Sequence, residues 1–101
     1  MGIEVTDHPE RGRYEVTVDG AAAGFCDHHE RDGVVVLPHT VVDPRFRGRG
    51  LAAHLVRRAL GDARARGLHV APQCWYVAQY IGDNPEHLDL VPEGDRGRYG
   101  L

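Results

Sequence analysis

Hydrophobic and polar positions alternate along the first half of the chain. In residues 13–18, Tyr14, Val16 and Val18 share one face and polar side chains share the other, which is the period of a half-buried β-strand. Asp19 and Gly20 then predict a two-residue hairpin turn. The small and apolar positions of residues 21–30 predict a second strand that pairs antiparallel with the first.

A turn at residues 31–33 leads into a run of β-branched residues, 34–42, that predicts a third strand and the most buried one. Pro38 interrupts this run. Because proline has no backbone N–H, it predicts a bulge or a gap in the pairing. Asp43 and Pro44 end the strand.

The pattern changes to a helical period after Gly50. Apolar side chains recur there at three- and four-residue spacing, and Gly67 predicts a left-handed stop. The stripe consists of Ala52, Leu55, Val56, Ala59, Leu60 and Ala63. Residues 68–71 predict a short strand and residues 74–81 a second, shorter helix, after which residues 86–101 predict only a weak apolar cluster followed by fraying.

This order of elements predicts a single α+β domain in residues 1–101, with a core at about 13–91 and a mainly antiparallel sheet covered by two helices. A chain of 101 residues is long enough for one hydrophobic core and too short for two.

Charge narrows the range of partners. The formal net charge is −3, so we expect no general attraction to nucleic acid or to an anionic membrane, and any anion site must be local. All twelve basic residues are arginine, which excludes the phosphate-binding lysine of a P-loop. The chain has neither a membrane-spanning apolar stretch nor a signal-peptide pattern, so we expect a soluble, cytoplasmic protein. We further expect a monomer or a weak dimer.

The potential metal ligands do not form a recognisable set. Cys26 and Cys74 have no CxxC partner, and in a cytosolic chain we expect both to be free thiols. No two of the seven histidines have the helical i, i+4 spacing of a zinc motif. We therefore expect no metal.

The strongest chemical signal is the arginine- and glycine-rich loop at residues 45–50, between a strand and the long helix. Backbone N–H groups converge at a helix N-terminus, where the helix dipole adds partial positive charge, so such a point binds phosphate. Gly48 and Gly50 leave these amides uncovered, and Arg45, Arg47 and Arg49 add guanidinium groups. Three arginines suit a ligand with more than one phosphate. Gly48, Gly50 and Ala53 also fit the dinucleotide pattern GxGxxG/A, but no acidic residue follows near Ala71, so we reject that reading.

Residues 45–50 resemble the Q/R-x-x-G-x-G/A signature of the GNAT superfamily of N-acetyltransferases. Four further segments resemble its short stand-alone branch, the YJDJ-type domain, and the resemblance covers roughly residues 14–91. These segments are His39-Thr40-Val41-Val42, Pro72-Gln73-Cys74, and Tyr80-Ile81 followed by Asn84-Pro85-Glu86.

This resemblance implies a GNAT-like fold whose sheet is splayed at an acetyl-coenzyme A site. The pyrophosphate is then expected on the amides of Arg47 to Ala52, and the pantetheine arm along the strand that ends at Val42. The implied cofactor-binding residues are Val41, Val42, Arg45, Arg47, Gly48, Arg49, Gly50, Leu51 and Ala52.

The implied reaction is transfer of acetyl to an amine of a small molecule or a peptide. The branch usually has an acidic residue where this chain has Val41, so a carboxylate base is absent there. His39 is the best-placed alternative base, because its unperturbed pKa lies near neutrality, although a purely structural histidine fits equally well. Tyr80 is a candidate to cap the pantetheine end or to protonate the departing thiolate, and Trp75 and Tyr76 are expected to pack.

Cys74 begins the second helix, where the dipole favours a thiolate that can act as a nucleophile. Direct attack by the amine and an acetyl-Cys74 intermediate both stay open, as does a small buried apolar role for this side chain. Two rival functions also stay open. One is a non-catalytic CoA-binding or protein-interaction module. The other is nucleic-acid binding by the arginine loop, which predicts a steeply salt-dependent affinity.

Overall fold

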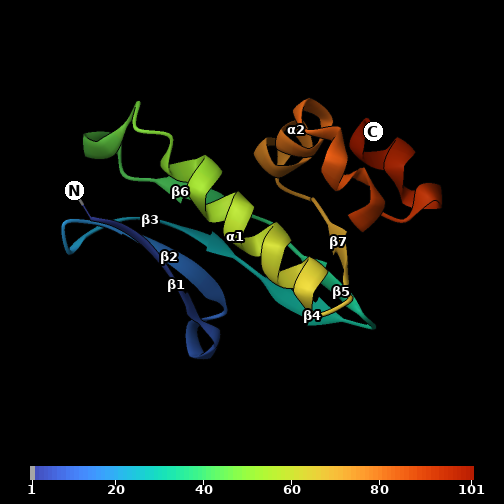
Figure 1. Ribbon diagram of the computed structural model, residues 1–101, viewed down its shortest axis with the longest axis horizontal. Coiled ribbons are helices and arrows are strands. Elements are labelled where there is room, and N and C mark those ends of the chain that lie inside the picture. The colour runs from blue at the N-terminus through green and yellow to red at the C-terminus, as the bar shows by residue number, and fades with distance from the viewer. Residues whose placement is uncertain (1) are drawn as a thin grey trace.

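The computed structural model describes residues 2–101 and contains two β-sheets (Figure 1). The larger sheet has the order β1-β2-β3-β6 and is antiparallel throughout. Its strands are β1 (Ile3–His8), β2 (Arg13–Val18), β3 (Ala21–Asp27) and β6 (Thr40–Val42). The smaller sheet has the order β4-β5-β7, with β4 (His29–Arg31) antiparallel and β7 (His69–Ala71) parallel to β5 (Val34–Val36).

Two α-helices and four short 3-10 helices complete the chain. The α-helices are α1 (Leu51–Ala65) and α2 (Trp75–Asp83). The 3-10 helices are η1 (Pro9–Arg11), η2 (Pro44–Phe46), η3 (Pro85–Leu90) and η4 (Glu93–Tyr99). Within residues 2–101, no helix is both long enough and apolar enough to cross a membrane.

The predicted first hairpin is confirmed. The strand predicted at residues 13–18 is β2, which has these bounds. It pairs with β3 across a turn in which Asp19 has φ 49° and Gly20 has φ 85°. The predicted second strand is two strands in the structure, because the chain passes at His28 from the larger sheet to the smaller one.

The predicted third strand is also divided, at Pro38. His29 pairs with Val36, whereas Asp27 donates its amide to the carbonyl of His39 at 2.9 Å, so Leu37 and Pro38 together face His28. One extra residue on one strand defines a β-bulge, as Pro38 predicts. The expected burial is correct for β5 and wrong for β6, which lies at the edge of its sheet and leaves Val41 46% exposed.

The first strand of the structure, β1, was not expected from the sequence. It pairs with β2 over its whole length, and its half-buried Ile3 and Val5 alternate with exposed Glu4 and Thr6. The period-two signal is therefore present in the sequence, but it covers few residues.

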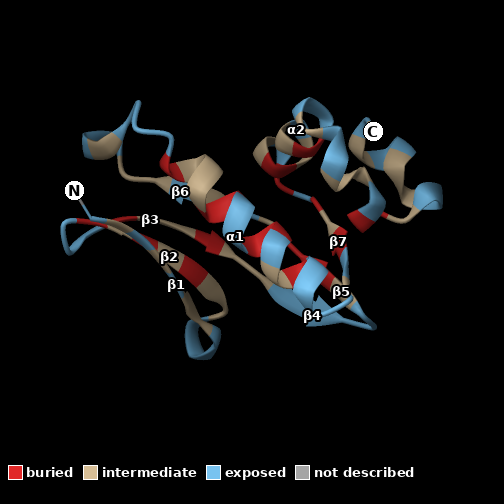
Figure 2. Cartoon of the chain, in the orientation of Figure 1, coloured by how far each residue is buried: buried red, intermediate tan, exposed pale blue. Residues whose placement is uncertain are grey.

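The long helix α1 buries one face against strands of both sheets (Figures 1 and 2). Leu51, rather than the expected Ala52, begins the buried stripe, which continues through Leu55, Val56, Ala59, Leu60 and Ala63. Gly67 follows with φ 68°, in the left-handed region that the sequence predicts. The helix thus holds the two sheets together.

The fraying expected after residue 91 is wrong. Residues 93–99 form η4, and Tyr99 and Leu101 pack against the core. The guanidinium of Arg96 donates to the carbonyl oxygens of Val91 at 3.0 Å and of Leu88 at 3.1 Å. One arginine therefore satisfies carbonyl groups at the end of η3 and orders the segment that follows.

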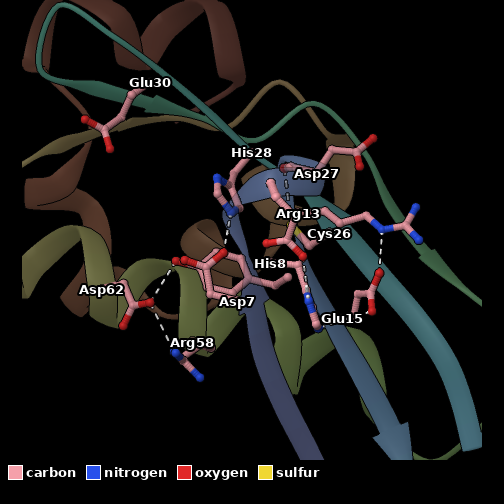
Figure 3. A network of polar contacts seen from close by, with 12 residues as sticks. Asp7, His8, Arg13, Glu15, Cys26, Asp27, His28, Glu30, Arg58 and Asp62 are labelled. Atoms are coloured by element: carbon pink, nitrogen blue, oxygen red, sulfur yellow. Dashed lines mark hydrogen bonds and ion pairs between the residues drawn. The ribbon is translucent and has the colours of Figure 1, made fainter.

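Polar contacts join β2 to α1, and join β1 to the link between β3 and β4 (Figure 3). The hydroxyl of Tyr14 donates to Asp62 at 2.8 Å, and Arg58 donates to the same carboxylate at 3.0 Å. His28 and Asp7 are joined at 2.7 Å between the β3–β4 link and β1. Burial, and then the bond to Asp62, raise the pKa of Tyr14.

Candidate functional site

The loop before α1 is held in shape by Asp43. Its carboxylate accepts the amide of Arg45 at 2.9 Å and the guanidinium of the same residue at 2.9 to 3.3 Å. The amide of Arg47 donates to the carbonyl of Pro44 at 3.2 Å, which closes η2. These bonds fix the backbone that leads to the glycines.

The amides from Gly48 to Ala53 have no hydrogen-bond partner among residues 2–101. The first bond of α1 is the later one from the amide of His54 to the carbonyl of Gly50, at 3.3 Å. Gly48 has φ 83° and Gly50 φ 70°, in the left-handed region that disfavours other residues. The first turn of α1 contains no acidic side chain. The geometry therefore presents a run of free amides with a positive dipole end, an arrangement that can bind an anion.

At this loop, the structure leaves fewer amides and guanidinium groups free for a phosphate than the sequence predicts. The amide of Arg47 is engaged by Pro44, so the free amides begin at Gly48 rather than at Arg47. Arg45 is paired with Asp43, and its guanidinium holds the pKa of that carboxyl below its ordinary value. Arg47 and Arg49 form no ion pair within the described chain, so they are the guanidinium groups free to meet a phosphate.

The strand β6 offers a second row of free backbone groups. On its paired side, β3 donates to the carbonyl of His39 and accepts from the amide of Asp43. Successive residues of an antiparallel ladder point their amides in alternate directions, so the amides of Thr40 and Val42 point away from β3. No strand covers that side, because β6 is the edge strand of its sheet. This free edge adjoins the loop that carries the free amides of Gly48 to Ala53.

The sheet opens where the expected splay lies. The parallel pairing of β5 with β7 ends with the amide of Leu37 donating to Ala71 at 3.1 Å and the amide of Cys74 donating to Leu37 at 2.9 Å. Beyond these bonds, β6 turns to β3 and the chain after β7 enters α2. A cavity of about 340 Å³ opens at this point, lined by Pro38, His39, Thr40, Val41, Gln73, Cys74 and Trp75.

This cavity brings together His39, Cys74 and Val41 of the predicted site. Cys74 is buried at the N-cap position of α2, whereas His39 is exposed. Trp75 is 74% exposed, so the expectation that it packs is wrong, and it stands with the exposed Val41 at the cavity. The lining residues carry an imidazole and a thiol but no carboxylate and no guanidinium.

The two cysteines differ in accessibility. Cys26 lies on β3 with no exposed area, and burial raises the pKa of its thiol to about 11. The hydroxyl of Thr40 donates to its sulfur at 3.6 Å. Cys26 therefore stays protonated inside the core, while Cys74 lines the cavity. Both are free thiols.

Tyr80 does not line this cavity. It lies on α2 one turn after Tyr76, and its ring stacks on His87 with centroids 5.8 Å apart. Tyr76 is half-buried, and burial raises the pKa of its hydroxyl. Tyr80 is thus separated from the group formed by His39 and Cys74.

Gly24 is a residue of the site region that the sequence did not single out. It lies on β3 opposite Val42, and a Cβ atom there would be 2.5 Å from the carbonyl oxygen of Val41. Its φ is unexceptional, so its role is close packing of the backbone rather than a special turn. Gly24 also lines a groove of about 440 Å³ on the larger sheet.

No group of three or more histidine, cysteine or acidic side chains within residues 2–101 is arranged to hold a metal ion. The site is built from backbone amides, two arginines, an imidazole and a thiol.

Comparison with known proteins gives a consistent result. Residues 13–90 match the family described as GCN5-related N-acetyl-transferase. The human protein NATD1 is 40% identical over 85 residues, a match that covers 82% of this chain and 75% of the human protein. Protein NATD1 of Gallus gallus is 33% identical over 93 residues, covering 85% of this chain and 84% of the chicken protein.

Solved structures share the fold. The ribosomal-protein-S18-alanine N-acetyltransferase from Escherichia coli superposes with a TM-score of 0.59 at 21% identity, over 69% of this chain and 49% of the bacterial chain. AAC(6')-Iy, solved with the bisubstrate analog CoA-S-monomethyl-acetylneamine, gives a TM-score of 0.50 at 25% identity, over 80% of this chain and 61% of that one. Each match spans only about half to three-fifths of the solved chain. The single α+β domain agrees with these neighbours, and the chain belongs to the GCN5-related N-acetyltransferase (GNAT) family.

Proposed function

We propose that this protein is an acetyl-CoA-dependent N-acetyltransferase that acetylates an amine of a small molecule or a peptide. The observation that carries the proposal is the continuity of unpartnered backbone groups. They run from the amides of Gly48 to Ala53, along the free edge of β6, to the cavity lined by His39 and Cys74. A ligand with a diphosphate, a flexible amide-containing arm and a reactive end fits this sequence of features.

Each part of the site has a distinct role in binding acetyl-CoA. The free amides and the guanidinium groups of Arg47 and Arg49 hold the diphosphate. The amides of Thr40 and Val42 hold the arm as an added strand would, while Val42 packs against the core. Arg45 acts through Asp43 by fixing the loop rather than by direct contact.

When bound, acetyl-CoA supplies the acetyl group as a thioester. An imidazole nitrogen of His39 takes the proton from the acceptor ammonium, so that a neutral amine can attack. A β6 amide donates to the carbonyl oxygen as negative charge develops there. The Cys74 thiol at the start of α2 has access to the same cavity.

The function is tested by mass spectrometry of reactions with a panel of polyamines, aminoacyl compounds and peptides, together with calorimetric titration of acetyl-CoA. We expect acetyl-CoA to bind and at least one amine to gain an acetyl group. Binding without any acetylated product would refute the enzyme and support a non-catalytic CoA-binding module. Absence of binding would refute both.

The route is tested separately with Cys74→Ala and Cys74→Ser. If the amine attacks directly, both variants retain acetyl transfer, and the intact wild-type protein gains no acetyl group when mixed with acetyl-CoA alone. An acetylated Cys74 peptide, absent from both variants, would establish the covalent route. His39→Ala should lower kcat most near neutral pH, where a free imidazole can accept a proton and an unassisted amine is still largely protonated.

A further inference from the structure

A second hollow lies beside the cavity at the splay. It has a volume of about 470 Å³ and is formed by one face of α2 and residues 99–101. Ala78, Gln79 and Gly82 supply its wall, and Tyr99 packs across from them. The Cβ position of Gly82 is 3.5 Å from the side chain of Leu101, so the ordered C-terminal segment shapes this hollow.

Trp75 lines both hollows. Its side chain is 74% exposed, which is unusual for a large apolar residue that contributes nothing to the core. The indole therefore borders both the cavity with His39 and Cys74 and the second hollow. The face of tryptophan is the best of the aromatic faces at attracting a cation.

The far end of the second hollow is negatively charged. Asp83 lines it, is the last residue of α2, and is exposed. The last turn of α2 contains no basic residue, and Asp83 forms no ion pair with any of residues 2–101. A carboxylate at a helix C-terminus lies against the negative end of the dipole and is unfavourable there, so a bound cation would relieve it.

We propose that the second hollow holds the distal ammonium group of a long diamine or polyamine acceptor, with Trp75 and Asp83 as its recognition elements. The acetylation half of this inference rests on the proposed function. Asp83 lies eight positions after Trp75 along α2, a rise of about 12 Å, so the acceptor must be long enough to span that distance.

The geometry divides the acceptor into two chemically different ends. The ammonium in the cavity gives one proton to His39, and its nitrogen then forms the bond to the acetyl carbon. The carbon–sulfur bond breaks, the thiolate takes the second proton lost by the nitrogen, and CoA leaves as the thiol. The distal ammonium remains protonated throughout. No carboxylate of residues 2–101 lines the first cavity to favour the charged form of the reacting amine, whereas the acidic end of the second hollow favours the charged form of the other amine.

The test uses intrinsic fluorescence, because Trp75 is the only tryptophan of the chain. Three ligands are titrated without acetyl-CoA at low salt: diaminodecane, aminodecanol of the same length with a neutral far end, and the shorter diaminobutane. We expect diaminodecane to bind roughly three- to fivefold more tightly than aminodecanol, as for an exposed ion pair. Diaminobutane is too short to reach Asp83, so its second ammonium group should add less affinity. The preference for diaminodecane over aminodecanol should shrink as salt is added.

Asp83→Asn should abolish the preference for diaminodecane over aminodecanol. Glu4→Gln is the matched control, since Glu4 is an exposed carboxylate on β1 that pairs with no described residue, and it should keep the preference. Heat-denaturation curves confirm that both variants fold. A preference that survives Asp83→Asn, or that Glu4→Gln removes equally, would overturn the inference.

Acetyl transfer separates this inference from the proposed function. Binding of diaminodecane that depends on Asp83, with no acetylated product from any amine, would leave the cation site standing and refute the transferase. Acetylation of monoamines and diamines with equal efficiency, unchanged by Asp83→Asn, would leave the transferase standing and refute the acceptor class.

Discussion

Ala53→Glu should separate the stability of α1 from its capacity to bind a diphosphate. Gly50 is the N-cap, so Ala53 is the third residue of the helix and contributes one of the unpartnered amides. The first turn has no acidic residue, and a glutamate there interacts favourably with the helix dipole. The same carboxylate lies beside the place proposed for the pyrophosphate and repels it.

The substitution is expected to change stability and affinity for acetyl-CoA in opposite directions. The dipole contributes about 0.3–1 kcal/mol to folding and the lower helix propensity of glutamate removes a few tenths of a kcal/mol, so stability should be unchanged or slightly raised. Two unit charges about 5 Å apart repel by roughly 0.8 kcal/mol in water and by roughly 3 kcal/mol at an effective dielectric constant of 20. Affinity for acetyl-CoA should therefore fall by about fourfold to about 200-fold.

The assay is calorimetric titration with acetyl-CoA at low salt, combined with urea denaturation of each variant. Ala53→Gln is the matched control, since it adds nearly the same volume without charge. Equal affinities of the Glu and Gln variants, with both folded, would refute the electrostatic reasoning. A loss shared by both variants would point instead to crowding by the longer side chain.

Two further changes test the packing around the site. Gly24→Ala should destabilise the protein by about 1–3 kcal/mol, because its Cβ would overlap the carbonyl of Val41. Gly61→Ala, at an exposed position of α1, should stabilise the protein by about 1 kcal/mol. Equal urea midpoints for the two variants would contradict this. The raised pKa of Tyr14 means that the unfolded chain ionises first, so the free energy of unfolding should fall as pH rises above about 10. Tyr14→Phe should remove the part of this fall in the free energy of unfolding that Tyr14 causes. If the free energy of unfolding falls as steeply with pH in the variant as in the wild type, Tyr14 is not its cause.

Features set by neighbouring residues were predictable from the sequence. The hairpin turn at Asp19 and Gly20, the bulge at Pro38 and the helix stop at Gly67 each depend on one residue's backbone preference. The free amides at the start of α1 follow from the same local rules, because the first amides of a helix have no partner within it.

Features set by distant contacts were not predictable. The exposure of Val41 depends on β6 being an edge strand, which is a property of sheet order and not of β-propensity. Residues 93–99 are ordered by the bonds of Arg96 to two carbonyls, in a segment whose composition indicates fraying. The exposure of Trp75 likewise depends on which face α2 turns to the core.

Val41→Glu tests whether the missing carboxylate limits catalysis. Position 41 is where the resembling branch has an acidic residue, and here its side chain lines the cavity with His39 and is 46% exposed. A carboxylate there costs little stability because it stays solvated, and it adds a second group able to take the acceptor proton. We expect kcat/KM to rise by at least about tenfold, within the range of general-base contributions. Val41→Gln, which adds the same bulk without a base, should give no such gain. If the two variants have equal turnover in a stopped-time acetylation assay, the absence of a carboxylate base does not limit catalysis. Proton removal by His39 would then be sufficient.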